Sequence, residues 1–201
     1  MLLENDANCA AWGEYCAMEQ KANMLMLTLG TGIGSGIVID GELYRGSRGY
    51  AGELGHVIIH PGGEQCACGQ KGCFERYASV SALVKRAGMA AEQNKDSILA
   101  KAFEKSANGK SFFDAAAQNC PIAQKVLTEY TDELKVGIDS ICSIFDPQCI
   151  VIGGGISEQK EMFFDRLCAV CSGVELRQAV LGNDAGVIGA ANLAMRRQDN
   201  E

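Results

Sequence analysis

Three cysteines within eight residues carry the clearest chemical signal in the sequence. Cys66, Cys68 and Cys73 lie among glycines, and their thiolates are the soft ligands that favour zinc. His56 precedes them and could complete a tetrahedral Cys3His site, with His60, the other histidine of the chain, as the alternative ligand. A site closed by four protein ligands has no open position for a substrate, so the pattern predicts a structural zinc ion. The competing interpretation is three free cysteines in a surface loop.

Acidic side chains lie close to these cysteines in the sequence. Glu53 is three residues before His56, and Glu75 is two residues after the last cysteine of the group. Asp6 lies apart from them, beside Asn5 at the expected start of the first helix. A single acid is usually a helix cap or a solvated surface group. Two acids that flank a metal-binding loop are less easily explained as caps or surface groups, so they predict a polar binding site.

Two glycine-rich turns follow apolar runs. The first, GTGIGSG at residues 30–36, would let backbone N–H groups approach a phosphate, although its spacing matches neither the P-loop nor the dinucleotide-binding pattern. An ordinary tight hairpin is almost equally compatible with it. The second, IVIGGGIS at residues 150–157, leads from a strand into a helix whose N-terminus would favour an anionic nucleotide.

Helices and strands must bring these groups together. The pattern predicts a helix over 7–21, apolar strands at 24–30 and 37–40, and a hairpin turn at Asp40–Gly41. The further expected elements are a strand at 57–59, helices at 79–93, 111–119, 121–145 and 158–172, a buried strand at 149–157 that runs into the second glycine turn, and a last helix over 182–197. This order favours one mixed α/β domain with a single central sheet.

Composition argues against several classes of protein. The chain has 201 residues, of which 47% are hydrophobic and 21% charged, enough to bury the core of one large domain. A net charge of -7 without a Lys/Arg cluster argues against a nucleic-acid partner. No apolar run approaches the roughly 20 residues of a membrane span. The seven other cysteines are scattered through helix- and strand-like stretches, which predicts reduced thiols and a cytoplasmic location.

The motifs together resemble the ROK family of repressors and sugar kinases, and within it the bacterial glucokinases. The matching stretches, in family order, are NDAN (5–8), LTLGTGIGSGIVIDG (27–41), GELGH (52–56), CACGQKGCFERYAS (66–79), DPQCIVIGGGIS (146–157) and LGNDAGVIGAA (181–191). The resemblance implies an α/β fold of the actin-like ATPase (ribonuclease H-like) class, with a mixed central sheet, helices on both faces and a zinc loop. It also implies phosphorylation of a hexose, glucose to glucose 6-phosphate, with ATP, Mg²⁺ and structural Zn²⁺.

The resemblance also implies a role for each candidate residue. Asp6 would be the catalytic base, accepting the proton of the sugar 6-hydroxyl as this group attacks the γ-phosphate of ATP. His56 would present one ring nitrogen to zinc and the other to the sugar. The sugar-binding residues would be Asn5, Glu53, His56 and Glu75. The zinc ligands would be His56, Cys66, Cys68 and Cys73. The nucleotide-binding residues would be Gly30, Thr31 and Gly32 on one phosphate loop, and Gly153, Gly154 and Gly155 on the adenosine side.

Kinases of this family carry an N-terminal lobe with another phosphate loop ahead of the NDAN motif. The resemblance therefore predicts that residues 1–22 are a remnant helix of that lobe and that residues 23–183 form the C-terminal domain, with the zinc loop at 56–75. Residues 184–201 would form a helix that packs back toward the lobe. We accordingly expect a truncated gene product or fragment that phosphorylates glucose poorly or not at all on its own.

Three alternatives stay open. The first is a ROK-type sugar-responsive transcriptional repressor, over which the intact glycine turns and the lack of a basic helix favour the kinase. The second is a kinase for N-acetylmannosamine, N-acetylglucosamine, allose or fructose, since the residues that would accommodate a 2-acetamido group cannot be identified from sequence. The third is a zinc-stabilised scaffold without catalysis. Related proteins are dimers or tetramers, so the resemblance also implies a homo-oligomer.

Overall fold

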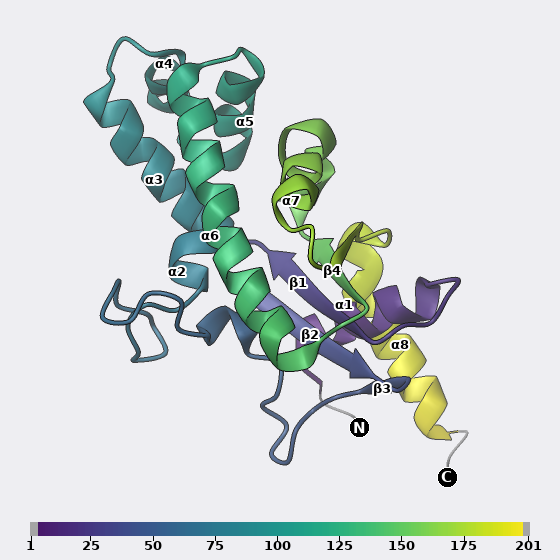
Figure 1. Ribbon diagram of the computed structural model, residues 1–201. Coiled ribbons are helices and arrows are strands. Elements are labelled where there is room, and N and C mark those ends of the chain that lie inside the picture. The colour runs from purple at the N-terminus through teal and green to yellow at the C-terminus, as the bar shows by residue number, and fades with distance from the viewer. Residues whose placement is uncertain (1–3, 199–201) are drawn as a thin grey trace.

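The computed structural model describes residues 4–198, and a five-stranded mixed sheet forms its centre (Figure 1). The strands are β1 (Met24–Leu29), β2 (Ile33–Ile39), β3 (Glu42–Leu43), β4 (Cys149–Gly153) and β5 (Glu175–Gln178). They lie in the order β3-β2-β1-β4-β5. The pairs β1–β2 and β2–β3 are antiparallel, whereas β1–β4 and β4–β5 are parallel. The predicted mixed central sheet is confirmed.

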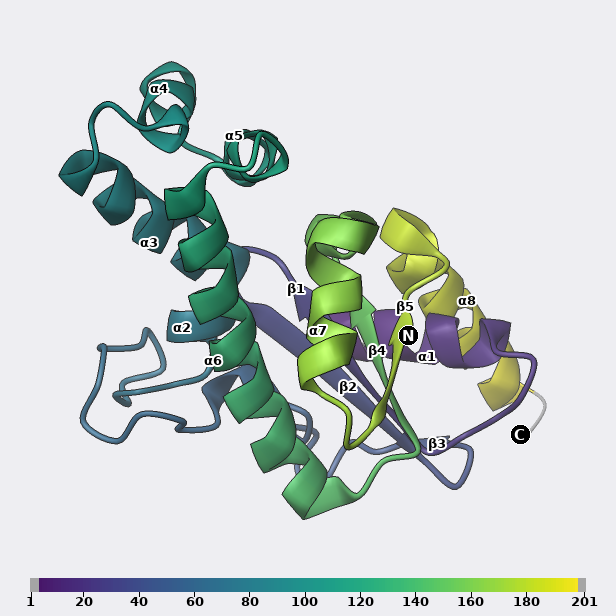
Figure 2. The ribbon, with the colours of Figure 1, turned by 45° about the horizontal axis from the view of Figure 1, so that its top comes forward.

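Helices cover both faces of the sheet, as expected (Figure 2). Side chains of β1 alternate between the faces because successive residues of a strand point in opposite directions. Leu25 belongs to the larger apolar core, which includes α6 (Pro121–Phe145). Met24 belongs to a smaller core that includes α1 (Asp6–Ala17) and α8 (Ala185–Gln198). The central strand therefore separates two apolar layers.

Shorter helices extend the larger core beyond the sheet (Figure 1). They are α2 (Glu75–Ala78), α3 (Val80–Gln93), α4 (Ile98–Lys105) and α5 (Gly109–Ala117), with α7 (Asp165–Val170) packed beside α6. Ser79 caps α3 by accepting a hydrogen bond from the N–H of Ala82 at 3.1 Å. Asn108 caps α5 in the same way, from the N–H of Ser111 at 2.9 Å. Such caps satisfy N–H groups that have no partner within the helix, and they fix where each helix begins.

The second strand is longer than predicted. It begins at Ile33 rather than at residue 37, so the glycine-rich stretch at 30–36 is a turn only over its first three residues. The remaining glycines lie inside the strand, where α1 packs on it. A Cβ atom on Gly36 would lie 2.5 Å from the Cβ of Ala11, so glycine at this position lets the helix approach the sheet closely.

Other expected elements also differ from the structure. The predicted strand at 57–59 is wrong, since Ile58 forms only a single bridge with Cys73 in an otherwise irregular loop. The predicted helix at 158–172 begins as a 3-10 turn and a π-helical turn before α7. The helix α4 and the strand β5 were not predicted. The residues of β5 are exposed or half-buried, and a strand of this kind lacks the apolar pattern that marks the central strands.

The helices α1 and α8 touch through their backbones. A Cβ atom on Gly189 would lie 1.7 Å from the carbonyl oxygen of Cys9, and one on Gly13 would lie 2.3 Å from the carbonyl oxygen of Ala185. Each glycine therefore occupies a contact where the other helix leaves no room for a side chain. This contact sets the position of α1 relative to the start of α8.

Replacing Gly189 with alanine should lower the free energy of unfolding by roughly 1–3 kcal/mol, because the methyl group forces the two backbones apart. Gly186→Ala is the matched control on the same helix, since an added Cβ there meets nothing within 4 Å. Alanine at that position should be neutral or stabilise the helix by up to about 1 kcal/mol. Urea unfolding followed by circular dichroism gives both values, and equal stability of the two variants would contradict the close contact.

The predicted segment boundaries at 22/23 and 183/184 stay predictions. The helices that they set apart, α1 and α8, pack against each other and on the sheet. Residues 1–3 and 199–201, which belong to the predicted terminal segments, lie outside the described residues. Within residues 4–198, no helix is long and apolar enough to cross a membrane.

Candidate functional site

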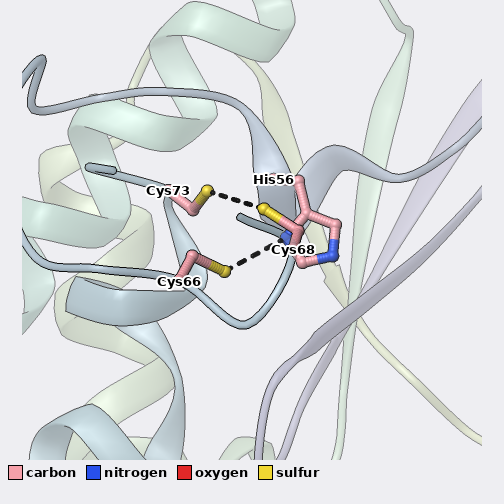
Figure 3. A group of neighbouring side chains, drawn as sticks. All are labelled: His56, Cys66, Cys68 and Cys73. Carbon is pink, nitrogen blue, oxygen red and sulfur yellow. Dashed lines mark hydrogen bonds between the residues drawn. The ribbon is translucent and has the colours of Figure 1, made fainter. Parts of the chain in front are cut away.

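His56 and the three cysteines converge at one point (Figure 3). Their ligand atoms all lie within 4.8 Å of one another. The distance from Cys66 Sγ to His56 Nδ1 is 3.7 Å, and the distance from Cys68 Sγ to Cys73 Sγ is 3.5 Å. Zinc–sulfur bonds of about 2.3 Å in a tetrahedron place the ligand atoms roughly 3.7 Å apart, which these separations match. The donor set and its geometry therefore fit a four-coordinate metal ion.

The cysteine loop, residues 56–75, is fixed by its backbone and by one buried aromatic ring. Gly72 has a φ of 87°, and a Cβ atom there would lie 1.8 Å from the carbonyl oxygen of His60. Phe74 follows the last cysteine, is fully buried, and lies with its ring against Gly137 of α6. Any side chain at position 137 would occupy the space of that ring. The long helix thus anchors the end of the loop.

The thiols of the loop differ in their acidity. Burial raises the pKa of the Cys73 thiol to about 12 and also raises that of Cys66. The backbone N–H of Gln70 lowers the pKa of Cys68, which is exposed. The Cys66 thiol donates a hydrogen bond to Glu75 Oε1 at 3.1 Å. A metal ion must displace the thiol protons, so its affinity falls as the pH is lowered.

His60, the alternative fourth ligand, has other partners. Its Nε2 is 2.6 Å from Glu133 Oε2 on α6. Its ring contacts that of Tyr77 edge-on, with the ring centroids 4.4 Å apart. These contacts engage His60 with α2 and α6, and His56 is the histidine that joins the cysteine cluster.

A cavity of about 580 Å³ lies beside the cysteine loop. Four of the five predicted catalytic and sugar-binding residues line it, namely Asp6, Glu53, His56 and Glu75. His56 connects the cavity to the cysteine cluster. Its Nδ1 faces Cys66 and lies 3.7 Å from Glu75 Oε1, whereas its Nε2 lies 4.0 Å from Glu53 Oε2. One ring nitrogen is therefore placed for a metal ion and the other for a ligand in the cavity.

Asn5 has a different position from the other predicted site residues. Its side-chain oxygen accepts hydrogen bonds from the N–H groups of Ala7, at 2.8 Å, and Asn8, at 3.3 Å. These bonds cap α1 and fix the first turn of the helix, which carries Asp6. Among the described residues, those that line the cavity include Asp6 but not Asn5.

The glycine turns after β1 and β4 border the same cavity. The predicted nucleotide residues that line it are Gly30, Thr31, Gly32, Gly153 and Gly154. Gly154 has a φ of 92°, and a Cβ atom there would lie 2.2 Å from the carbonyl oxygen of Leu29, so only glycine fits. Gly155 instead lines a second cavity of about 990 Å³, which also touches Gly30 and Thr31. The first glycine turn therefore lies between two adjoining cavities.

The second cavity has walls that were not predicted. Val84 of α3, Phe113 of α5 and Met162 provide apolar surface, while Lys110 adds a cationic group and Asp114 an anionic one. Apolar walls with a few polar groups suit a flat aromatic ligand. No local motif marks a wall assembled from separate helices, so these residues could not be predicted from sequence.

The segment before α8 also contributes to the first cavity. Gly182 and Asn183 line it, together with Ala185 and Gly186 at the start of the helix. They lie in the LGNDAGVIGAA stretch that supported the family resemblance, but no role was predicted for them. Their place in that motif was the one available signal.

Ser35 fixes the segment that carries Glu53. Its hydroxyl donates a hydrogen bond to the carbonyl of Gly52 and accepts one from the N–H of Leu54 at 3.0 Å. These two residues flank Glu53, and Ser35 itself is buried. The sequence pattern did not identify this role because Ser35 was assigned to a glycine turn rather than to a strand.

Ser35→Ala should lower the free energy of unfolding by about 1–3 kcal/mol, because it leaves the carbonyl of the half-buried Gly52 and the buried N–H of Leu54 without their partner. The Leu54 amide should also exchange its hydrogen faster. Ser143→Ala is the control, since that hydroxyl bonds only to the Asp139 carbonyl of its own helix, at 2.8 Å on an exposed face. Chemical unfolding and hydrogen exchange test both variants, and wild-type behaviour of Ser35→Ala would contradict this role.

Residues 1–197 match the ROK family. The glucokinase of Streptomyces coelicolor is 37% identical over 211 residues, which cover 96% of this chain and 67% of that protein. The xylose repressor of Bacillus spizizenii is 31% identical over 206 residues, which cover 97% of this chain and 50% of that protein. The chain thus spans about two thirds of the length of the glucokinases that it matches.

A solved structure supports the same family assignment. The ROK family glucokinase from Streptomyces griseus, in complex with glucose and AMPPNP, superposes with a TM-score of 0.88 and 35% identity. The superposition covers 97% of this chain and 68% of that one. The α/β fold of the actin-like ATPase class that the motifs implied is therefore confirmed. This chain belongs to the ROK family.

Proposed function

We propose that this chain carries the sugar and nucleotide sites of a glucokinase, which transfers the γ-phosphoryl group of ATP to the 6-hydroxyl of glucose. One observation carries the proposal: the cavity of about 580 Å³ joins Glu53, His56 and Glu75 to the acid Asp6 and to both glycine turns. The glucokinase relatives support it, as does the related structure in complex with glucose and AMPPNP.

The sugar side of the cavity suits a polyol. Glu53 and Glu75 can accept hydrogen bonds from hydroxyl groups, and His56 can donate one from Nε2 when its Nδ1 faces the metal. An epimer with one hydroxyl misplaced would leave such a group unpaired, which costs more than the loss of a surface contact. The carboxylates and the histidine therefore select a hexose by its pattern of hydroxyls.

Asp6 accepts the proton of the 6-hydroxyl when this group attacks the γ-phosphate. Phosphoryl transfer depends mainly on positioning and on neutralising charge, so a well-placed acid and backbone N–H groups suffice for much of the effect. The turn Gly30–Gly32 lies next to the phosphates of ATP, and Gly153 and Gly154 adjoin them. Mg²⁺ bound to ATP would neutralise part of the phosphate charge. The adenosine occupies the second cavity beside Gly155.

Zinc would be held by His56, Cys66, Cys68 and Cys73, and its contribution would be to stiffen the loop rather than to act on the substrate. The metal and the cavity share His56. With Nδ1 on the metal, the tautomer would be fixed and Nε2 would carry the proton toward the sugar. Glu75 lies directly after the cysteines, so the same loop would also position this second sugar contact.

Calorimetric titration of the purified chain with glucose and with AMPPNP tests this function. We expect both to bind, and expect mannose, fructose, allose, N-acetylmannosamine and N-acetylglucosamine to bind more weakly than glucose. Tighter binding of another sugar would transfer the proposal to that hexose, and failure to bind any of them would overturn it. The expected poor turnover of the chain by itself stays a prediction, which a coupled assay for glucose 6-phosphate checks.

A sugar-responsive repressor is the second candidate, favoured by the 31% identity to a xylose repressor. The nucleotide titration separates the two functions. Binding of glucose without binding of AMPPNP would favour the repressor, because a kinase requires the nucleotide and a sugar-responsive repressor does not.

The cellular setting and the assembly are further proposals. All ten cysteines are free, which suits the reducing conditions of the cytoplasm. We propose a homo-oligomer, a dimer or a tetramer, without a nucleic-acid or membrane partner. Light scattering coupled to gel filtration tests the assembly, and a monomer at micromolar concentration would contradict it.

A further inference from the structure

A buried carboxylate lies outside the cavity of about 580 Å³, which we call the sugar cavity, and its burial needs a physical explanation. Glu14 of α1 is 3% exposed, and both of its oxygens accept backbone hydrogen bonds. Oε2 accepts from the N–H of Val180 at 3.0 Å, and Oε1 accepts from the N–H of Leu181 at 2.8 Å. Burying a carboxylate costs free energy unless hydrogen-bond donors replace the lost water. The two backbone N–H groups supply such donors, so the pairing is a specific interaction rather than incidental packing.

The segment that Glu14 binds has little apolar packing of its own. It runs from the end of β5 to the start of α8, and its residues are exposed or half-buried. The Val180 side chain is 75% exposed. The N–H of Ala179 bonds to the Ile152 carbonyl at 3.0 Å, and the N–H of Asp184 bonds to the Leu181 carbonyl at 3.1 Å. Between these two bonds, the carboxylate of Glu14 connects the segment to α1.

This segment forms a wall of the sugar cavity. Ala179, Gly182 and Asn183 line the same cavity as Asp6. Asp6 and Glu14 both belong to α1, and Gly13 contacts the start of α8 through the carbonyl of Ala185. The helix that carries the acid therefore also carries the residue that holds the wall. The wall lies on the α1 side of the cavity, whereas His56 and Glu75 belong to the cysteine loop and Glu53 lies just before it.

We propose that Glu14 is a positioning residue, which fixes the wall of residues 179–183 relative to Asp6 and so shapes the end of the cavity that accommodates a phosphoryl group on the 6-oxygen. The inference rests on the proposed function, because it takes the 6-oxygen to lie at Asp6. Glu14 does not touch the substrate. Its effect should therefore appear with a ligand that carries the phosphoryl group and not with glucose alone, which Glu53, His56 and Glu75 bind.

Two variants and one control test the inference by titration with glucose and with glucose 6-phosphate. Glu14→Gln keeps the shape but offers only one acceptor oxygen, and Glu14→Ala removes both. In each, we expect the Kd for glucose 6-phosphate to rise about tenfold or more, because a loosened wall must be ordered again when this ligand binds, while the Kd for glucose changes little. Glu19→Gln, an exposed acid just beyond α1, should change neither value. A merely structural role of Glu14 would move both affinities together, and that result would overturn the proposal.

Hydrogen exchange of the wild-type chain gives a second test. This test does not depend on whether the variants fold. The amides of Val180 and Leu181 should exchange much more slowly than those of the exposed Gly182 and Asn183. Equal exchange rates would show that Glu14 does not hold the wall. If the wild-type chain binds neither glucose nor glucose 6-phosphate, the proposed function fails, while slow exchange would still assign the wall to Glu14.

Discussion

Cys73→Ser should reduce bound zinc from about one ion per chain to a trace, because a structural site of this kind needs all four ligands. Cys73 is fully buried and its sulfur lies 3.5 Å from that of Cys68. A serine hydroxyl there is a poor zinc ligand and cannot restore the site. Loss of the metal should lower the free energy of unfolding by more than about 4 kcal/mol, as the loss of a metal site can do. Glucose binding should weaken as well, since His56 loses the metal that orients it.

Cys149→Ser is the matched control for this substitution. Cys149 is also fully buried, but it lies in β4 and belongs to the smaller apolar core rather than to the cysteine loop. The Cys149→Ser variant should lose some stability but keep its zinc. Elemental analysis after gel filtration and thermal unfolding of both variants check the prediction. Zinc retained by Cys73→Ser at the wild-type ratio would show that the cluster is not a metal site.

Elements with strong local signals were predictable from sequence. The long helix α6 starts at Pro121 and ends at Phe145, as predicted, because proline suits the first turn and Asp146, with a φ of 42°, ends the helix. The hairpin at Asp40–Gly41 is equally local, since both residues adopt positive φ. The cysteine cluster could be predicted because its ligands lie within one loop.

Elements that depend on distant partners were not predictable. The strand β5 exists because it pairs with β4, and nothing in its four residues identifies it. The apolar triplet at 57–59 resembles a strand, but Ile58 is 44% exposed and no neighbouring strand extends along it. In both cases the pairing decides the structure, and the local residue types do not.

The residues of the candidate site also divide into those that local sequence could predict and those that depend on distant partners. The roles of Asp6 and Glu53 came from the family resemblance, because 46 residues separate them in the chain and spacing alone could not bring them together. The structure does so by packing α1 on β2, where Gly36 leaves room for the helix. Glu14 and Ser35 escaped prediction for another reason. Each acts through hydrogen bonds to the backbone of a segment that is distant in sequence, and such partners leave no motif.

Asp6→Asn should lower kcat for glucose phosphorylation by about 10²–10⁴-fold, the usual contribution of a general base. The amide has the shape of the carboxylate, so the start of α1 and the cavity should remain intact. It cannot accept the proton of the 6-hydroxyl, however, and the attacking oxygen remains a poor nucleophile. The KM for glucose should change only a few-fold, because an interaction made only in the transition state contributes to kcat and not to ground-state binding.

Glu53→Gln supplies the contrasting variant. Under the proposed function Glu53 binds the sugar in the ground state, so its substitution should mainly raise KM. Steady-state assays of both variants, in preparations with measurable turnover and at saturating ATP, separate the two roles. Calorimetry with glucose adds a readout that is independent of turnover, in which Asp6→Asn should bind nearly as well as wild type and Glu53→Gln should bind more weakly. A kcat close to wild type in Asp6→Asn would mean that the proton leaves by another route. A large loss of glucose affinity in that variant would instead place Asp6 among the sugar contacts.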